Sequence, residues 1–263
     1  MSGEPAHAFD DGVEYERFMG QWSRAVGPTF LEWLEAPANA RWLDVGCGTG
    51  ILTRLIADRC RPAQLCAIDP APAQVAQAQR QLAGTAIGFQ VADASALPHR
   101  DGSFDVVAAA LVLNFVADRA RALAEMRRVA RRGGTIAAFV WEFETERSPS
   151  GPMRRGLRAV GGEVPAVPGT RAAGLAALQR LFESEGLDAI ATRTIEVRVE
   201  FPDFESYWSS QMPRYNPITK TIAALAEGDR DRMRSLVRAE LAPRLDGSCV
   251  VEARANAIKA RAR

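Results

Sequence analysis

The sequence predicts an α/β protein built on a doubly wound, largely parallel sheet. Short apolar runs alternate with helical segments between residues 41 and 141, a pattern typical of strands that crossover helices bury on both faces. Glycine occupies every second position from 46 to 50, directly after the first apolar run. Two late strand-like stretches have no crossover helix tightly between them, which favours an antiparallel addition at one sheet edge.

The elements follow in order from this alternation. The expected strands of the first half cover 41–45, 64–68, 86–91, 104–109 and 135–141. Helices are predicted at 50–58, 73–83 and 118–129, and the last of these has Asp118 as its N-cap and Gly133-Gly134 closing its C-terminal side. Apolar residues at helical spacing over 13–34 predict an earlier helix that Pro28 kinks or divides. Residues 1–11 are polar and are expected to be disordered.

The pattern loosens after residue 141. Residues 142–172 contain several prolines and glycines, and they are predicted to form a loop with a short helix. A helix at 173–185, an alternating strand at 189–201, a mostly helical aromatic-rich stretch at 203–245 and a last strand at 248–258 complete the expected elements.

Composition narrows the possible partners. The 263 residues carry 33 basic and 32 acidic side chains, a formal net charge of +1, which argues against a nucleic-acid partner. The four cysteines form no CxxC pair, which favours reduced thiols in a cytoplasmic protein over a disulfide framework or a zinc site. The longest apolar stretch, 106–116, is too short to span a bilayer.

The glycine turn predicts a nucleotide-like ligand. Gly46, Gly48 and Gly50 let the backbone bend tightly and approach a ligand, and the following helix offers free N–H groups. Asp69 ends the second strand about twenty residues later, where an acid hydrogen-bonds ribose hydroxyls in doubly wound folds. Asp93 ends the third strand at the same predicted sheet edge.

The turn departs from a dinucleotide fingerprint in two ways. The third glycine of G-x-G-x-x-G would fall at position 51, which is Ile51. Asp44 would repel a pyrophosphate but suits a cationic group such as an ammonium or a sulfonium.

These motifs together resemble those of class I S-adenosylmethionine-dependent methyltransferases, in the small-molecule branch similar to the ubiquinone/menaquinone C-methyltransferases. The resemblance covers residues 41–141, and its motifs are Asp44-Val45-Gly46-Cys47-Gly48-Thr49-Gly50, Asp69, Asp93-Ala94, Phe104-Asp105-Val106-Val107 and Arg132-Gly133-Gly134. Tyr15-x-x-Phe18-Met19-x-x-Trp22-Ser23-Arg24 resembles the N-terminal helix of bacterial members. The resemblance implies a Rossmann-like seven-stranded sheet with an antiparallel last strand, an N-terminal helical segment and a helical cover.

The resemblance also implies domain limits and cofactor contacts. Residues 1–34 would be an N-terminal tail and helical lid, and residues 35–263 the methyltransferase domain, with substrate-covering insertions at about 142–172 and 202–245. S-adenosyl-L-methionine, and its product S-adenosyl-L-homocysteine, would contact Arg24, Asp44, Gly46, Cys47, Gly48, Gly50, Asp69, Pro70, Asp93, Ala94 and Leu111. Asp44 would hold the ammonium, Asp69 the ribose and Arg24 the carboxylate.

The methyl acceptor is predicted to be a small organic molecule. Leu113-Asn114-Phe115-Val116 lacks the prolines of DNA amino-methyltransferases, and no Pro-Cys pair is present. The expected acceptor pocket consists of Trp22, Asn114, Trp141, Tyr207, Trp208 and Tyr215. Candidates for a catalytic base are Tyr15, His99 and Asn114. No metal, nucleic-acid partner or membrane span is expected, and the protein would be a monomer or homodimer.

Simpler interpretations remain open at this point. Asp69 could cap a helix, Asp93 could serve a turn, and His99 could be a solvated loop residue. The tryptophans could be core residues. A methyltransferase-like protein that binds the cofactor without catalysis, or an NAD-dependent oxidoreductase, are the alternative functions.

Overall fold

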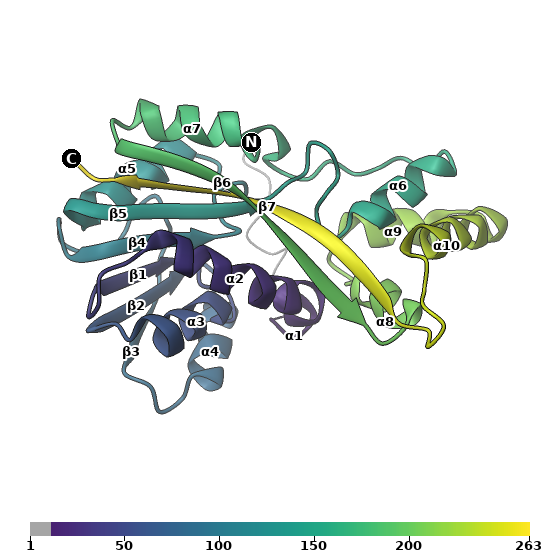
Figure 1. The fold of residues 1–263 in the computed structure, drawn as a ribbon, viewed down its shortest axis with the longest axis horizontal. Coiled ribbons are helices and arrows are strands. Elements are labelled where there is room, and N and C mark those ends of the chain that lie inside the picture. The colour runs from purple at the N-terminus through teal and green to yellow at the C-terminus, as the bar shows by residue number, and fades with distance from the viewer. Residues whose placement is uncertain (1–11) are drawn as a thin grey trace.

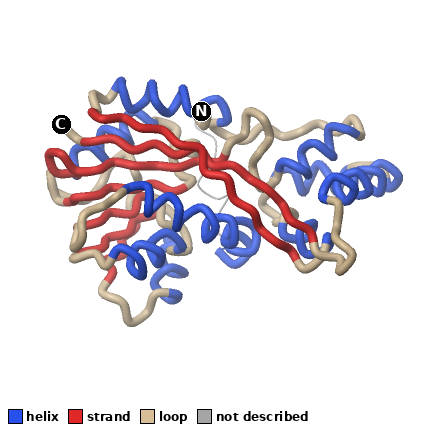
Figure 2. Tube along the Cα trace, viewed as in Figure 1, coloured by secondary structure: helices blue, strands red, loops and turns tan. Residues whose placement is uncertain are grey.

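The computed structural model describes residues 12–263, which form a seven-stranded sheet with helices on both faces (Figures 1 and 2). The strands are β1 (Arg41–Val45), β2 (Gln64–Asp69), β3 (Ile87–Val91), β4 (Phe104–Ala110), β5 (Ala130–Trp141), β6 (Asp188–Phe201) and β7 (Cys249–Arg261). The helices are α1 (Gly12–Tyr15), the π-helical η1 (Glu16–Gly20), α2 (Gln21–Leu34), α3 (Ile51–Cys60), α4 (Pro72–Gln81), α5 (Arg119–Val129), α6 (Gly151–Ala159), the short η2 (Thr170–Ala172), α7 (Leu175–Ser184), α8 (Phe204–Ser210), α9 (Pro217–Ala224) and α10 (Glu227–Leu241).

The sheet order confirms the predicted topology. The strands lie in the order β3-β2-β1-β4-β5-β7-β6. The pairs from β3 to β5 are parallel, whereas β7 runs antiparallel to both β5 and β6. The chain leaves β1 towards β2 and β3 on one side and returns to β4 on the other, so the carboxyl ends of β1 and β4 flank the switch point where such sheets bind ligands.

Two apolar cores lie on the two faces of the sheet. Alternate residues of β5 point to opposite sides, so that Phe139 and Trp141 join one core while Ile136 and Val140 join the other. The first core includes apolar residues of α2 and α3, and the second includes those of α5 and α7. This double burial is the reason why the strands read as continuous apolar runs in the sequence.

The last two strands extend beyond the rest of the sheet. β5 pairs with β7 only from Trp141–Ala255 to Thr135–Arg261. Beyond that point β6 and β7 pair with each other alone, from Glu196–Arg254 to Phe201–Cys249, and we call this two-stranded segment the ribbon. It reaches the helices α6, α8, α9 and α10, which we call the helical lobe (Figure 1).

Several sequence-based boundaries need correction. Pro28 does not divide its helix, since α2 runs unbroken through it, and the irregular turn is η1 instead. Gly133-Gly134 does not close α5, which ends at Val129; both glycines lie in β5, where Gly133 N–H donates to Ala262 O at 2.8 Å. Asp118 is confirmed as the N-cap, because its side chain accepts from the N–H of Arg121 at 2.9 Å. The disorder predicted for residues 1–11 lies outside the described residues.

Candidate active site

The glycine turn combines tight packing on one side with open space on the other. Gly46, Gly48 and Gly50 all have positive φ angles, +73°, +53° and +88°, a region that favours glycine. A Cβ on Gly46 would lie 2.3 Å from Cγ2 of Val112, so the turn packs closely against the segment after β4. A Cβ on Gly48 would meet no described atom within 4 Å. The backbone at Gly48 can therefore be approached closely by a ligand.

Asp44 supplies a buried negative group directly before this turn. Its side chain is fully buried, and its Oδ2 accepts a 2.6 Å hydrogen bond from the Thr53 hydroxyl. Its Oδ1 has no hydrogen-bond partner within residues 12–263. Burial raises the pKa of Asp44 to about 7, although the bond from Thr53 acts in the opposite direction. An unpaired buried carboxylate oxygen beside an open turn fits the ammonium of an amino-acid-bearing cofactor.

Asp69, at the end of β2, ties the turn to the next strand. Its Oδ2 accepts from the N–H of Gly48 and its Oδ1 from the N–H of Ala71, both at 2.9 Å. Burial raises the pKa of Asp69, and these two backbone donors lower it. Each carboxylate oxygen retains a lone pair that ribose hydroxyls would use. Asp69 therefore does more than serve a local turn at α4, because it also orients Gly48.

Asp93 and Ala94 follow β3 on the same edge of the sheet. The Oδ1 of Asp93 accepts from the N–H and the hydroxyl of Ser95, at 2.7 and 2.5 Å, which is the turn geometry of the simpler interpretation. Ala94 is buried and Asp93 is exposed. Because the carboxyl ends of neighbouring parallel strands meet at one edge, Asp44, Asp69 and Asp93 form a row along β1, β2 and β3.

Leu111 and Cys47 complete the buried wall near the turn, and Pro70 is exposed. Leu111 has a φ of +62°, a left-handed conformation that costs a bulky residue free energy. Its N–H donates to Phe139 O at 2.8 Å, which holds the strained residue at the end of β4. The sequence gives no sign of this strain, because glycine and asparagine are the residues typical of the left-handed conformation and position 111 is a leucine.

The N-terminal helical segment lies beside the turn. Tyr15 is close enough to Asp69 for the carboxylate to add to the effect of burial, and together they raise the pKa of the phenol to about 12. Arg24 is engaged by Glu16, whose Oε1 accepts from its Nη1 at 2.9 Å. The predicted carboxylate-binding guanidinium therefore already has an anionic partner.

The predicted acceptor residues gather only in part. The rings of Trp22 and Trp141 pack edge to face with centroids 6.3 Å apart, and Phe201 of the ribbon lies 6.0 Å from Trp22. Phe201 in turn contacts Tyr207 at 5.2 Å. Tyr215 packs on Phe18 of η1 at 6.4 Å. The sequence did not predict that Phe18 and Phe201 lie beside these residues. The helical spacing of Phe18 and the alternating spacing of Phe201 indicate only core positions.

Trp208 and the candidate bases have different surroundings. Trp208 packs against Phe204 and beneath the guanidinium of Arg234, within the helical lobe. His99 packs on Phe104, the first residue of β4, and so lies towards the opposite edge of the sheet from Asp69. Burial lowers the pKa of His99. Asn114, by contrast, follows β4 at the glycine edge and is buried, and its Nδ2 finds no acceptor among the residues described.

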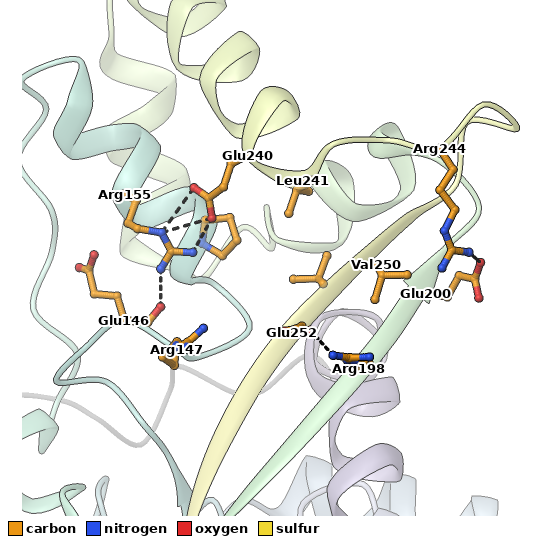
Figure 3. A pocket seen from close by; sticks show the side chains of 12 residues that line it. Glu146, Arg147, Arg155, Arg198, Glu200, Glu240, Leu241, Arg244, Val250 and Glu252 are labelled. Atoms are coloured by element: carbon orange, nitrogen blue, oxygen red, sulfur yellow. Dashed lines mark hydrogen bonds and ion pairs between the residues drawn. The ribbon is translucent and has the colours of Figure 1, made fainter.

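A separate cavity lies far along the ribbon. It measures about 660 Å³ and lies between the ribbon, α6 and α10 (Figure 3). Its charges pair largely with one another: Arg155 with Glu240, Arg244 with Glu200 and Arg198 with Glu252. None of the residues that line it belongs to the glycine turn. The chemistry expected at Asp44 and Asp69 is therefore not located in this cavity.

Comparisons with known proteins agree with this geometry. Residues 43–138 match a family described as the methyltransferase domain. The chain is 36% identical over 157 residues to a malonyl-[acyl-carrier protein] O-methyltransferase of Geobacter sulfurreducens, covering 59% of each chain. It is 36% identical over 121 residues to a demethylmenaquinone methyltransferase of Thermus thermophilus, covering 45% of this chain and 53% of that one. The chain thus spans less than two thirds of the length of these curated relatives.

A solved structure shows the same fold over most of the chain. A phosphoethanolamine N-methyltransferase of Haemonchus contortus in complex with S-adenosyl-L-methionine superimposes with a TM-score of 0.58 at 15% identity, covering 95% of this chain and 56% of that one. Residues 43–138 thus match a methyltransferase domain, and the sheet order and the glycine turn agree with that match. The unpaired Oδ1 of Asp44 and the open space at Gly48 fit the ammonium group and the close backbone approach of S-adenosylmethionine.

Two further observations concern other ligands. Among residues 12–263, no group of three or more His, Cys, Asp or Glu side chains is arranged to hold a metal ion. Within the same range, every helix is too short or too polar to cross a bilayer.

Proposed function

We propose that the protein transfers the methyl group of S-adenosylmethionine to a small organic molecule. The observation that carries the proposal is the fully buried Asp44, with one oxygen unpaired, beside the open backbone at Gly48. S-adenosylmethionine brings the activated methyl group. The task of the protein is to bind, orient and exclude water, so the proposal does not depend on a catalytic triad.

The roles of the residues follow from their positions. Asp44 would hold the ammonium and Asp69 the ribose hydroxyls. Asp69 also fixes Gly48 through the 2.9 Å bond from its N–H. We assign the adenine to the segment Asp93-Ala94 and the acceptor to the side of Trp22, Trp141 and Tyr215. Tyr15 and Asn114 are better placed than His99 to contact the acceptor, since they lie on the glycine side of the sheet. Each would orient the acceptor by hydrogen bonding rather than remove its proton, because an amide takes up no proton near neutral pH and burial keeps the Tyr15 phenol protonated.

A small acceptor is supported by charge and by the relatives. The net charge of +1 offers no broad attraction for nucleic acid. The relatives named above are named for methylation of malonyl-[acyl-carrier protein] and demethylmenaquinone. We assign the described part of residues 1–34 to a lid and the segments 142–172 and 202–245 to the acceptor cover; the tail predicted at the start of the chain lies outside the described residues. The four free cysteines support a cytoplasmic location. We propose a monomer or homodimer.

Calorimetric titration tests the proposal directly. We expect S-adenosylmethionine to bind with a Kd in the micromolar range, a free energy of about −8 kcal/mol, and NAD not to bind. Asp69→Ala should weaken the binding strongly, because it removes the ribose acceptor and frees Gly48. Binding of NAD, or unchanged affinity in Asp69→Ala, would refute the assignment. Binding without methyl transfer to any member of a panel of small acceptors would favour the non-catalytic alternative.

A further inference from the structure

The C-terminal end of α4 packs against the glycine turn. A Cβ on Gly50 would lie 2.9 Å from Cδ1 of Leu82 and 3.2 Å from Cβ of Ala78. Gln81, between these two residues, donates from Nε2 to Oε2 of Glu16 at 2.6 Å. Glu16, on the N-terminal helical segment, is therefore bound to the residue next to Leu82, which packs against the turn that we assign to the cofactor.

The second oxygen of Glu16 holds Arg24. Its Oε1 accepts from Nη1 of Arg24 at 2.9 Å, across the π-helical turn η1. Gly20 leaves the room for this pair, since a Cβ there would lie 2.8 Å from Cγ of Glu16 and 3.0 Å from Nη2 of Arg24. The pair is partly solvated, with 51% of the Arg24 side chain and 28% of the Glu16 side chain exposed. An ion pair of this kind is weak enough for another carboxylate to replace Glu16 on Arg24.

We propose that Glu16 is an internal competitor for Arg24. Its carboxylate binds the Arg24 guanidinium, to which the resemblance assigns the carboxylate of S-adenosylmethionine. Binding of the cofactor replaces one carboxylate by the other on Arg24, while Gln81 retains its bond to Glu16. The inference rests on the proposed function, and it assigns a positioning role to Glu16 that the sequence motif does not indicate.

The test compares two ligands by calorimetry in Glu16→Gln. The glutamine oxygen can still accept the hydrogen bond from Gln81, but the neutral side chain no longer forms an ion pair with Arg24. We expect the Kd for S-adenosylmethionine to fall by about two- to five-fold, the range for release of an exposed ion pair. Decarboxylated S-adenosylmethionine, which lacks the competing group, should bind Glu16→Gln and the wild type equally.

Two variants separate competition from other effects. In an Arg24→Ala background, Glu16→Gln should give no further gain, whereas a general charge effect would persist there. Glu200→Gln, which removes a comparable 2.6 Å ion pair with Arg244 on the ribbon, should leave both affinities unchanged. Unchanged or weaker binding of S-adenosylmethionine to Glu16→Gln, or an equal gain for the decarboxylated ligand, would overturn the proposal. Failure of the wild type to bind S-adenosylmethionine would instead refute the proposed function.

Discussion

At the residue scale, two carboxylates of one site have different environments. Asp44 is fully buried and accepts one hydrogen bond, from Thr53, so the cost of desolvation dominates and its pKa rises to about 7. Asp69 accepts two bonds from backbone N–H groups, which offset part of the same cost. Asp44 is thus the group whose charge state responds to a cationic ligand, while Asp69 maintains the geometry of the turn.

This difference predicts proton release when the cofactor binds. At about pH 6 Asp44 is mostly protonated in the free protein, and an ammonium beside it favours the ionised form. Affinity for S-adenosylmethionine should therefore rise with pH up to about 7 and then level off. Calorimetry in two buffers of different ionisation enthalpy should detect close to one proton released at about pH 6 and far fewer at about pH 8. The absence of proton release at the lower pH would contradict the assignment of Asp44.

The raised pKa of Asp44 also predicts that the stability of the protein falls as pH rises, whereas the affinity for the cofactor rises. The pKa of Asp44 is raised above its value in the unfolded chain, so between about pH 4 and pH 7 the folded state retains a proton that the unfolded state has lost. The cofactor-free protein should therefore lose stability as pH rises through this window. Asp44→Asn, which cannot ionise, is the control: it should abolish this part of the slope in denaturant titrations, and also the proton release.

At the element scale, α5 anchors the connection between β3 and β4. Arg128 donates to the carbonyl oxygens of Leu97 and His99 at 2.9 and 2.8 Å. Glu125, nearly buried, accepts from the N–H of Leu97 at 2.9 Å and pairs with Arg128 at 2.7 Å. This connection begins at Asp93 and Ala94, so the helix holds the segment that we assign to the adenine.

Removal of this anchor should be costly. Arg128→Ala leaves Glu125 nearly buried without its charged partner and breaks the bonds to the connection. We expect a loss of about 2 kcal/mol in the free energy of unfolding, measured by denaturant titration. Arg127→Ala is a matched control on the same helix, because Arg127 donates to the exposed Glu185 carbonyl; it should lose less than about 0.5 kcal/mol. Equal losses for the two variants would show that the anchor contributes nothing specific.

At the scale of the whole molecule, the ribbon connects the sheet with the helical lobe (Figure 1). Its inward residues Val197, Val199 and Phe201 are buried, while Glu196, Arg198 and Glu200 between them are exposed. One apolar core runs from α2 along the ribbon into the lobe. Within the lobe, α6 and α10 approach closely at Gly156, where a Cβ would lie 2.5 Å from Cγ2 of Val237.

A larger side chain at position 156 should lower the stability of the protein without changing its affinity for the cofactor. Gly156→Leu forces α6 away from α10, and we expect a loss of about 1–3 kcal/mol in the free energy of unfolding. Affinity for S-adenosylmethionine should remain unchanged, because the glycine turn lies on the sheet. Gly228→Ala, in α10 with no described atom within 4 Å of the new Cβ, should not destabilise the protein. A parallel loss of cofactor affinity in Gly156→Leu would show that the lobe also shapes the cofactor site.

The sequence by itself determined the sheet and the glycine turn at its edge. Buried strands, glycine turns and the acids near the carboxyl ends of β1, β2 and β3 are local features, because backbone conformation and side-chain periodicity depend on near neighbours. The seven-stranded sheet with its antiparallel strand was therefore predictable, with most boundaries close to those observed. Errors arose where distant contacts overrule local preference, as at Gly133, whose N–H pairs with Ala262.

Only the tertiary structure decided how the N-terminal helical segment meets the rest of the molecule. Glu16 reaches Gln81 across 65 positions, and Glu14 accepts from Arg214 across 200. The same holds for Trp22, whose contacts with Trp141 and Phe201 join three distant segments. No periodicity encodes such pairings, since they depend on how helices and strands pack after the sheet has formed. The sequence thus specifies the methyl donor, while packing decides what surrounds it.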